Sequence, residues 1–344
     1  LDRNGLRPSR YLITTNDLIV MGSETGVQTF PAEEIREKGR LKPGKMLLVD
    51  TLEGKIYHDE ELKAKLAGEF PYGEWIGKNM VNLEEIETGH HESPEMGDQY
   101  DKYITSFNYS LEDTDRIIKE MAATGKEPIG SMGNDVPIAV LSKKPYRLFN
   151  YFKQLFAQVT NPPIDHIREE LVMTLSGYLG SLQTNILDVS PDHVKMVRFK
   201  NPVITNTYFQ IVKNLRYKGF SAANLRLLFD ASSGSEGLQS AVDQLCIDSE
   251  KAVDEGKNYI ILSDRGINEK LAPIPSIMAV SAVHHHLIKT RKRMQIDIVV
   301  ESAEPREVMH FALLFGYGAS IINPYMSFAV IDKPVGLTVN KSDT

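Results

Sequence analysis

Polar side chains follow four runs of β-prone residues in the second half of the chain. The runs cover residues 225–230, 259–264, 296–301 and 319–323. The side chains at or beside their ends are Asp230, Asp264, Arg265, Glu301 and Asn323. Because functional groups of β/α folds lie at the carboxyl ends of parallel strands, these side chains could hold a small ligand. Alternatively, Asp and Ser side chains cap the following helices, and Asp264 pairs with its neighbour Arg265.

A second polar cluster lies in the segment Gln158–Asp165, which contains two adjacent prolines. The prolines remove two N–H donors and stiffen the chain, whereas Gln158, Thr160 and Asn161 offer hydrogen-bonding groups without charge. Such a segment could line a polar passage. Alternatively, it ends one helix and begins the next, and Arg168 pairs locally.

Metal and flavin sites are disfavoured by the residues around them. Three consecutive histidines, His284 to His286, point about 100° apart on a helix and cannot form one ligand face. Gly316 and Gly318 lie between a helix and the next strand, at the wrong edge of a sheet for phosphate, so their expected role is helix termination. The glycine-rich loop Ser232–Gly237 lies on the correct edge but contains a glutamate. We expect neither a metal nor a flavin in this segment.

The strand runs alternate with helical patterns over residues 237–255, 275–289 and 305–315. This alternation predicts parallel pairing and part of a β/α barrel. A further helix is predicted over 111–125, a strand over 138–141 and a helix over 148–156. Residues 11–14 with 18–21, and 45–50 with 55–57, predict two hairpins, followed by a helix over 59–66. Residues 68–105 are rich in Gly, Pro, His and Glu, and we expect a linker there.

Composition and charge exclude several classes of protein. The 344 residues include 39 Lys and Arg against 46 Asp and Glu, and the net charge of −7 disfavours nucleic acid and anionic membranes as partners. A single cysteine, Cys246, fits a reducing compartment and excludes a disulfide or iron–sulfur site within the chain. We expect the cytoplasm or an organelle stroma. The chain opens without Met and with the turn dipeptide Asn4-Gly5, so we expect a fragment of a longer protein.

Several long motifs, in order, resemble the central domain of the glutamate synthase large subunit. They are Phe156-Ala-Gln-Val-Thr-Asn-Pro-Pro-Ile-Asp165, Arg168-Glu-Glu-Leu171, Ile261-Leu-Ser-Asp-Arg-Gly266, Ala272-Pro-Ile-Pro-Ser276, Ala282-Val-His-His-His-Leu287 and Phe315-Gly-Tyr-Gly-Ala319. The resemblance covers about Ser106 to Val330. Residues 1–30, with Asp2-Arg-Asn-Gly-Leu-Arg-Pro8, are similar to the end of a class II glutamine amidotransferase domain.

The resemblance implies a fold and a domain order. The expected fold is α/β: a degenerate, flavin-less β/α barrel preceded by a small β-rich piece. The expected domains are 1–67 (the end of the glutaminase domain), 68–105 (a linker), 106–332 (the barrel-like central domain) and 333–344 (a linker toward the flavin domain). The catalytic cysteine of the glutaminase and the flavin domain are expected outside the chain, which therefore holds no complete active site.

The resemblance also implies a role in glutamate and ammonia metabolism. The complete enzyme makes two glutamates from glutamine, 2-oxoglutarate and a reductant, with FMN and an iron–sulfur cluster outside this segment. Its partners would be the glutaminase and FMN domains, and ferredoxin or a pyridine-nucleotide-dependent small subunit, in the cytoplasm or a plastid stroma. The segment would join two active sites and line an ammonia channel with Thr160, Asn161 and Gln158. The alternatives are a free-standing barrel enzyme using Asp230, Asp264 and Glu301, or a purely structural spacer.

Overall fold

The structure is a computed structural model of the chain. It describes residues 1–2, 5–24, 26–86, 96–128, 141, 143, 146–152, 163–180, 187–216 and 219–333. Internal contacts divide the chain into two units, and each is described by itself. The first unit comprises Leu1–Trp75 and Gln158–Thr174, and the second comprises Ile76–Ala157 and Leu175–Thr344. Among the described helices, none is both long enough and apolar enough to cross a bilayer.

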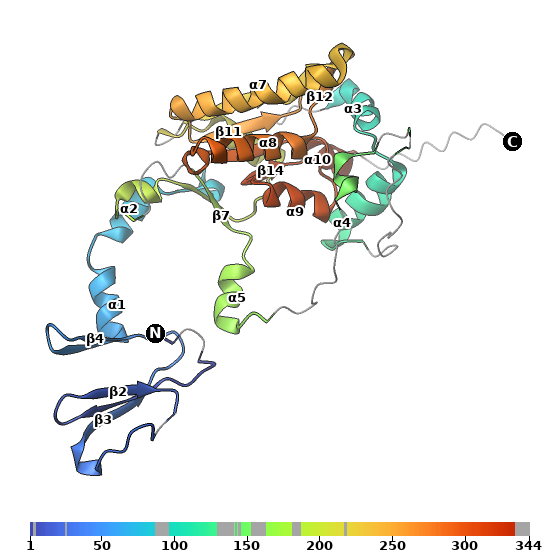
Figure 1. The fold of residues 1–344 in the computed structure, drawn as a ribbon. Helices are drawn as coiled ribbons and strands as arrows, with labels where there is room; N and C mark the ends of the chain where they lie inside the picture. Colours follow the sequence, from blue (N-terminus) through green and yellow to red (C-terminus); the bar gives the residue numbers. More distant parts are fainter. Residues whose placement is uncertain are drawn as a thin grey trace. The chain divides into compact units, whose positions relative to one another are not determined.

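The first unit is built from antiparallel strands (Figure 1, blue). β1 (Arg10–Thr14) lies between β2 (Ile19–Gly22) and β3 (Ile35–Arg40), and β4 (Leu47–Asp50) pairs with β5 (Lys55–His58). The two predicted hairpins are therefore confirmed, and β3 is a strand that the sequence patterns missed. The sequence of β3 is Ile-Arg-Glu-Lys-Gly-Arg, and its four charged residues conceal the apolar alternation that is typical of a strand. The short helix η1 (Ala32–Glu34) precedes β3, and α5 (His166–Val172) also belongs to this unit.

Helix α1 (Asp59–Ala67) confirms the helix predicted over 59–66, and its first residue contacts the loop between β3 and β4. The Asp59 carboxylate accepts hydrogen bonds from Lys45 Nζ at 2.8 Å and from the Met46 N–H at 3.1 Å, and it pairs with Lys63 at 2.9 Å. The Lys45 hydrogen bond is the main cause that lowers the pKa of Asp59 to about 2. The carboxylate also lies in the first turn of the helix, where negative charge is favourable.

The second unit contains a parallel sheet of order β14-β13-β11-β9. The strands are β9 (Ala222–Arg226), β11 (Tyr259–Ser263), β13 (Asp297–Glu301) and β14 (Ile321–Asn323). The helices between and after them are α7 (Gly234–Asp254), α8 (Ser276–Lys289), α9 (Val308–Gly316) and α10 (Tyr325–Asp332). The predicted alternation and parallel pairing of these runs are confirmed.

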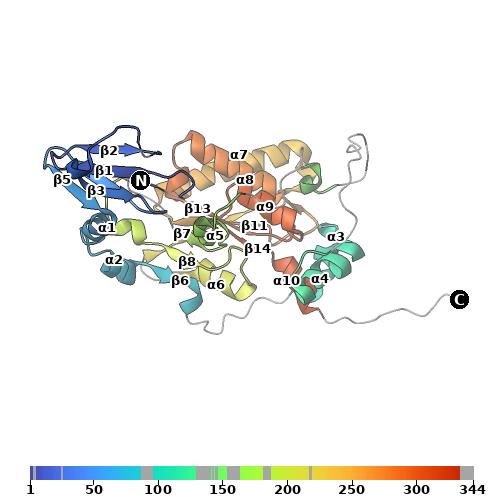
Figure 2. The ribbon, with the colours of Figure 1, turned by 90° about the horizontal axis from the view of Figure 1, so that it is seen from below.

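Both faces of this sheet are buried. Ile260 and Ile298 pack into a core with α7 and α8, whereas the alternate residues Tyr259, Ile261 and Val299 pack into a second core. The second core is completed by α6 (Asn206–Asn214) and by a small sheet of order β6-β8-β7. Its strands are β6 (Val81–Asn82), β7 (Gly177–Leu179) and β8 (Val197–Phe199). Figure 2 shows the parallel strands between α7 and α8 on one side and α6 on the other. Such two-sided burial explains the continuous apolar runs of the strands.

The first predicted parallel strand, over residues 225–230, is wrong in its limits. The chain leaves the sheet after Arg226, and Leu228–Asp230 forms β10, which pairs antiparallel with β12 (Leu271–Pro273). The buried Leu227 marks the change, since its N–H bonds to Ser263 and its carbonyl to Ile274. The fold is mixed α/β with four parallel strands in the main sheet, and the described residues contain no closed barrel.

Residues 68–105, where a linker is expected, contain secondary structure. The elements are α2 (Tyr72–Asn79), β6, η2 (Leu83–Glu85), η3 (Gly97–Gln99) and α3 (Tyr100–Ser106). The predicted helix over 111–125 is present as a π-helix, Glu112–Ile118, followed by α4 (Lys119–Thr124), and it ends at Gly125 with a φ of 67°. Of the helix predicted over 148–156, the structure describes a 3₁₀ turn, η5 (Leu148–Tyr151). The strand predicted over 138–141 lies outside the described residues except for Leu141. Short 3₁₀ turns lie at η6 (Pro191–Val194), η8 (Ala231–Ser233) and η9 (Arg293–Gln295).

Candidate functional site

Three of the predicted site residues meet at the carboxyl edge of the parallel sheet. Glu301, the last residue of β13, is fully buried, and its Oε2 accepts a hydrogen bond from the Ser263 hydroxyl of the neighbouring strand at 2.6 Å. Its Oε1 accepts one from Arg265 Nε. The guanidinium of Arg265 lies 3.8 Å from the ring centre of Tyr325, the first residue of α10. The Glu301 carboxylate therefore joins the carboxyl ends of β11 and β13.

Asp264 lies beside this group and has its own set of donors. Its carboxylate accepts hydrogen bonds from the Ser302 hydroxyl at 2.6 Å, the Tyr325 hydroxyl at 2.7 Å and the Ala303 N–H at 3.0 Å. Burial raises the pKa of Asp264 to about 7, against the lowering effect of these hydrogen bonds. The expected pair between Asp264 and Arg265 is wrong, because Arg265 binds Glu301. The two acidic groups thus have separate partners.

Two tyrosines that precede the parallel sheet in the chain, Tyr103 and Tyr109, cover the loops after β11 and β13. The Tyr103 hydroxyl accepts a hydrogen bond from the Gly266 N–H at 3.0 Å, and the Tyr109 hydroxyl donates to the Ala303 carbonyl at 2.6 Å. Burial raises the pKa of Tyr109 to about 12, so this hydroxyl stays protonated. Tyr103 and Tyr109 share one buried cluster with Tyr325. The sequence patterns gave no signal for this contact, because it joins residues about 160 to 190 positions apart, beyond the reach of local periodicity.

A buried arginine fixes the same segment. The fully buried Arg306 donates to the carbonyls of Phe107 at 2.8 Å and Asn108 at 3.2 Å, and it pairs with Asp113 at 3.2 Å. Its guanidinium carbon lies 3.5 Å from the ring centre of Tyr109. The backbone of residues 107–113 is thereby held over the loop that follows β13.

The two remaining strand-end candidates do not join this group through their side chains. Asn323 Nδ2 donates to the Ile204 carbonyl and to Asn206 Oδ1, both at 3.0 Å, while its Oδ1 has no partner among the described residues. Asp230 lies on β10, outside the parallel sheet, and is exposed. Its carboxylate accepts from the Ser232 N–H at 2.9 Å, so it acts as the cap of η8, and these bonds lower its pKa.

The carboxyl edge does not fit a flavin phosphate. Such a group needs free backbone N–H donors after the strands. After β13, the N–H groups of Ala303, Glu304 and Arg306 already donate to Asp264, Ser302 and His310. After β14, the first residue is Pro324, which has no N–H. The single cysteine of the chain also cannot hold an iron–sulfur cluster, which needs several thiolates.

The three consecutive histidines, His284 to His286, have three different environments. His284 Nδ1 accepts from Arg293 Nε at 2.9 Å, and His286 Nε2 lies 2.9 Å from the Glu250 carboxylate. His285 Nδ1 instead lies 2.8 Å from the Ser281 carbonyl of its own helix. In the part of the chain that the structure describes, no three His, Cys, Asp or Glu side chains are placed to hold a metal ion.

The channel candidates Gln158, Thr160 and Asn161 lie outside the described residues. The structure describes the end of their motif, where Arg168 Nε donates to the Asp165 carboxylate at 2.6 Å and the Arg168 N–H donates to the same carboxylate at 3.1 Å. This local pair at the start of α5 is the one that the structural interpretation of the motif predicted. The role of Gln158, Thr160 and Asn161 in a channel stays a prediction.

Comparison with known proteins agrees with the resemblance seen in the motifs. Residues 102–342 match the family model described as "Glutamate synthase central domain", and residues 1–75 match "Glutamine amidotransferases class-II". The chain is 43% identical to "Glutamate synthase [NADPH] large chain" of Bacillus subtilis over 97% of its length, and 40% identical to "Glutamate synthase [NADH]" of Schizosaccharomyces pombe, also over 97%. It is 41% identical to the chloroplastic "Ferredoxin-dependent glutamate synthase" of Spinacia oleracea over 95%.

The chain spans 22%, 16% and 20% of these three relatives. The central-domain match alone covers more than half of the chain, and the amidotransferase match precedes it, in the order expected from the motifs. The chain therefore belongs to the glutamate synthase family, as a segment that contains its central domain.

Proposed function

We propose that the chain is the connecting segment of a glutamate synthase that converts glutamine, 2-oxoglutarate and a reductant into two glutamates. The observation that carries this proposal is the order of the two family matches, an amidotransferase part at residues 1–75 and the central domain at 102–342. In the complete enzyme, FMN and an iron–sulfur cluster supply the electron chemistry. This segment would join the glutaminase domain to the synthase domain.

The second part of the proposal is that the segment contributes to an ammonia channel through Thr160, Asn161 and Gln158. Ammonia must stay neutral on its way between two active sites. Hydroxyl and amide groups can exchange hydrogen bonds with neutral ammonia, whereas carboxylates would favour ammonium and retain it. The motif supplies three such groups within four positions, beside two prolines that stiffen the chain.

The strand-end polar groups support a connecting role better than catalysis at this edge. The carboxylates of Asp264 and Glu301 each have two or more donors from within the chain. A ligand would have to displace these bonds. We therefore interpret the four parallel strands as a rudimentary, flavin-less barrel, with the domain limits given above, whose ligand end is closed by its own tyrosines.

The relatives take electrons from different donors, as their names state. We propose that the complete enzyme uses ferredoxin or a pyridine-nucleotide-dependent small subunit, in the cytoplasm or in a plastid stroma.

The channel role is tested by the ratio of glutamine hydrolysed to glutamate formed in the complete enzyme. Thr160→Leu should raise this ratio several-fold, because an apolar side chain removes a hydrogen-bonding group and narrows the passage. The matched control is Thr51→Leu, since Thr51 is exposed in the turn between β4 and β5. Thr160→Leu with an unchanged ratio would contradict the channel role and would favour a structural spacer.

A further inference from the structure

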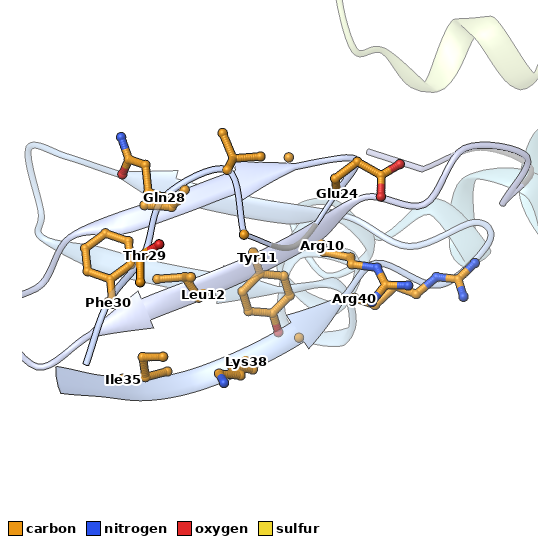
Figure 3. Close-up of a pocket in the computed structure, with 15 residues that line it drawn as sticks. Arg10, Tyr11, Leu12, Glu24, Gln28, Thr29, Phe30, Ile35, Lys38 and Arg40 are labelled. Carbon is orange, nitrogen blue, oxygen red and sulfur yellow. The ribbon is translucent and has the colours of Figure 1, made fainter. Parts of the chain in front are cut away.

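Two features of the chain have no part in the function proposed above. One is a pocket on the sheet β2-β1-β3, lined by Arg10, Leu12 and Phe30 among others (Figure 3). It lies wholly within residues 1–75 and so belongs to the amidotransferase part of the chain. The other is the buried side chain of Asn323 in the second unit, whose Oδ1 has no hydrogen-bond partner among the described residues.

Asn323 belongs to a row of polar side chains that closes one core of the second unit. The register of the parallel sheet pairs Ser263 with Glu301 and Glu301 with Asn323, and residues paired in this way lie on the same face of a sheet. Two positions earlier, Ile261 and Ile321 lie on that face and pack into the second core, which α6 completes. The polar row therefore lies at the carboxyl end of the space between the parallel sheet and α6.

The amide group of Asn323 is fixed in its orientation. The residue is fully buried, and its Nδ2 donates to the Ile204 carbonyl and to Asn206 Oδ1, both at 3.0 Å. Turning the amide over would place Oδ1 against these two oxygen atoms, so Oδ1 stays directed away from them. A buried acceptor without a donor is costly, and native proteins usually satisfy it with a bound molecule where no protein donor reaches it. Asn323 Oδ1 therefore calls for a small donor.

The surroundings of Asn323 favour a neutral donor over a cation. Glu301, the carboxylate of the row, already accepts from the Ser263 hydroxyl at 2.6 Å and forms an ion pair with Arg265. Helix α6 begins at Asn206, and the N-terminus of a helix carries a partial positive charge. The first turn of α6 also supplies N–H groups that have no acceptor within their own helix. Water and ammonia meet these conditions, because both are small and neutral, and both donate and accept hydrogen bonds.

We propose that Asn323 Oδ1 accepts a hydrogen bond from one molecule of neutral ammonia, which takes the place of water there during turnover. The inference rests on the proposed function, because that function releases ammonia within the same polypeptide. An amide oxygen holds neutral ammonia without the negative charge that would favour ammonium. Asn323 would thus add a second ammonia contact, in the interior of the second unit, to the motif around Thr160.

The contact is tested in the complete enzyme by supplying ammonium chloride in place of glutamine. Asn323→Leu keeps the approximate size of the side chain but removes the acceptor. It should raise the KM for ammonia roughly threefold to tenfold, as expected for the loss of one neutral hydrogen bond, with kcat nearly unchanged. The KM for 2-oxoglutarate should stay the same. The matched control is Asn214→Leu, because Asn214 is exposed at the other end of α6. It should leave the KM for ammonia unchanged.

Diffraction from crystals of the unsubstituted complete enzyme gives a second readout. One bound molecule should lie about 2.7 to 3.2 Å from Asn323 Oδ1. Thallium(I), which resembles ammonium in charge and size, should give no anomalous signal at this position. A site without any bound molecule, or one that binds thallium(I), would overturn the proposal.

If Asn323→Leu does not fold, Asn206→Ala replaces it. This substitution removes one of the two acceptors that fix the amide of Asn323, so it should raise the KM for ammonia by a smaller factor. A bound molecule at Asn323 with an unchanged KM for ammonia in the variant would identify a water molecule only, and this result would also overturn the proposal.

Failure of this inference is distinguishable from failure of the proposed function. If the complete enzyme forms glutamate from ammonium chloride, 2-oxoglutarate and a reductant, but Asn323→Leu leaves the KM for ammonia unchanged, the assignment of Asn323 fails alone. If neither glutamine nor ammonium chloride yields glutamate, the proposed function itself fails. The ratio measured with Thr160→Leu tests the channel motif and does not depend on Asn323.

Discussion

The Tyr325 hydroxyl donates a 2.7 Å hydrogen bond to Asp264 Oδ1 and thereby joins the end of β11 to the start of α10. Both side chains are about 1% exposed. Burial raises the pKa of Asp264, and burial, together with the neighbouring Asp264 carboxylate, raises the pKa of Tyr325 well above its ordinary value. A carboxylate in such surroundings is tolerated only because several donors face it. The contact therefore makes the stability of the fold dependent on pH.

The first prediction concerns this pH dependence. The folded pKa of Asp264 is about 7, above its ordinary value of 3.8. A raised carboxyl pKa contributes stability that is fully present below pH 3.8 and is lost as the pH rises through about 7. Asp264→Asn removes this titration, and its amide can accept from Tyr325 and Ala303 and donate to Ser302. Between pH 5 and pH 8, the free energy of unfolding of the unsubstituted chain should fall by about 1 to 3 kcal/mol more than that of Asp264→Asn.

Urea denaturation at both pH values measures this difference. The control is Asp230→Asn, because Asp230 is exposed and its pKa is lowered by its cap. That variant should keep the steep dependence between pH 5 and pH 8. Equal slopes for the unsubstituted chain and Asp264→Asn would show that Asp264 does not titrate in this range.

The second prediction compares two glycines at the end of α9. Gly318 has a φ of 110°, and a Cβ at this position would lie 2.3 Å from Nδ1 of His284, which Arg293 holds by a hydrogen bond. Gly318→Ala should therefore lower the free energy of unfolding by about 2 to 4 kcal/mol through strain and overlap. At Gly316 a Cβ would meet nothing within 4 Å. Gly316→Ala should be neutral or stabilising by up to about 1 kcal/mol. Thermal unfolding of both variants distinguishes them, and similar losses for the two would contradict the prediction.

The glycine pair also shows what sequence patterns can and cannot predict. The end of the helix at Gly316 to Gly318 follows from local rules, as do the parallel strands and the turn at Gly125. The partner of Arg265 does not, because the nearest carboxylate along the chain, Asp264, is not the one that it binds. That choice depends on how Glu301 and Tyr325 are brought to the same edge from distant positions. The short strand β3 is missed because Arg36, Lys38 and Arg40 face solvent, and because the residues between them, Glu37 and Gly39, contact the distant Tyr11.

The last prediction concerns Arg306, whose hydrogen bonds and ion pair join residues 107–113 to the loop after β13. Its side chain is fully buried, and besides the carbonyls of Phe107, Asn108 and Glu304 and the Asp113 carboxylate it contacts the Tyr109 ring. Arg306→Met fills similar space but leaves Asp113 with Arg147 as its remaining cation, at 3.3 Å. Removing one member of a buried pair typically costs about 3 to 5 kcal/mol, and we expect a loss of this order.

Because the lost bonds hold residues 107–113, hydrogen exchange should increase most in α3 and α4. The paired variant Arg306→Met with Asp113→Leu should recover part of the loss, since no carboxylate is then left buried without its partner. A uniform increase in hydrogen exchange across the second unit, with no recovery of the free energy of unfolding in the paired variant, would contradict this prediction. It would show that Arg306 supports general packing rather than the contact with residues 107–113.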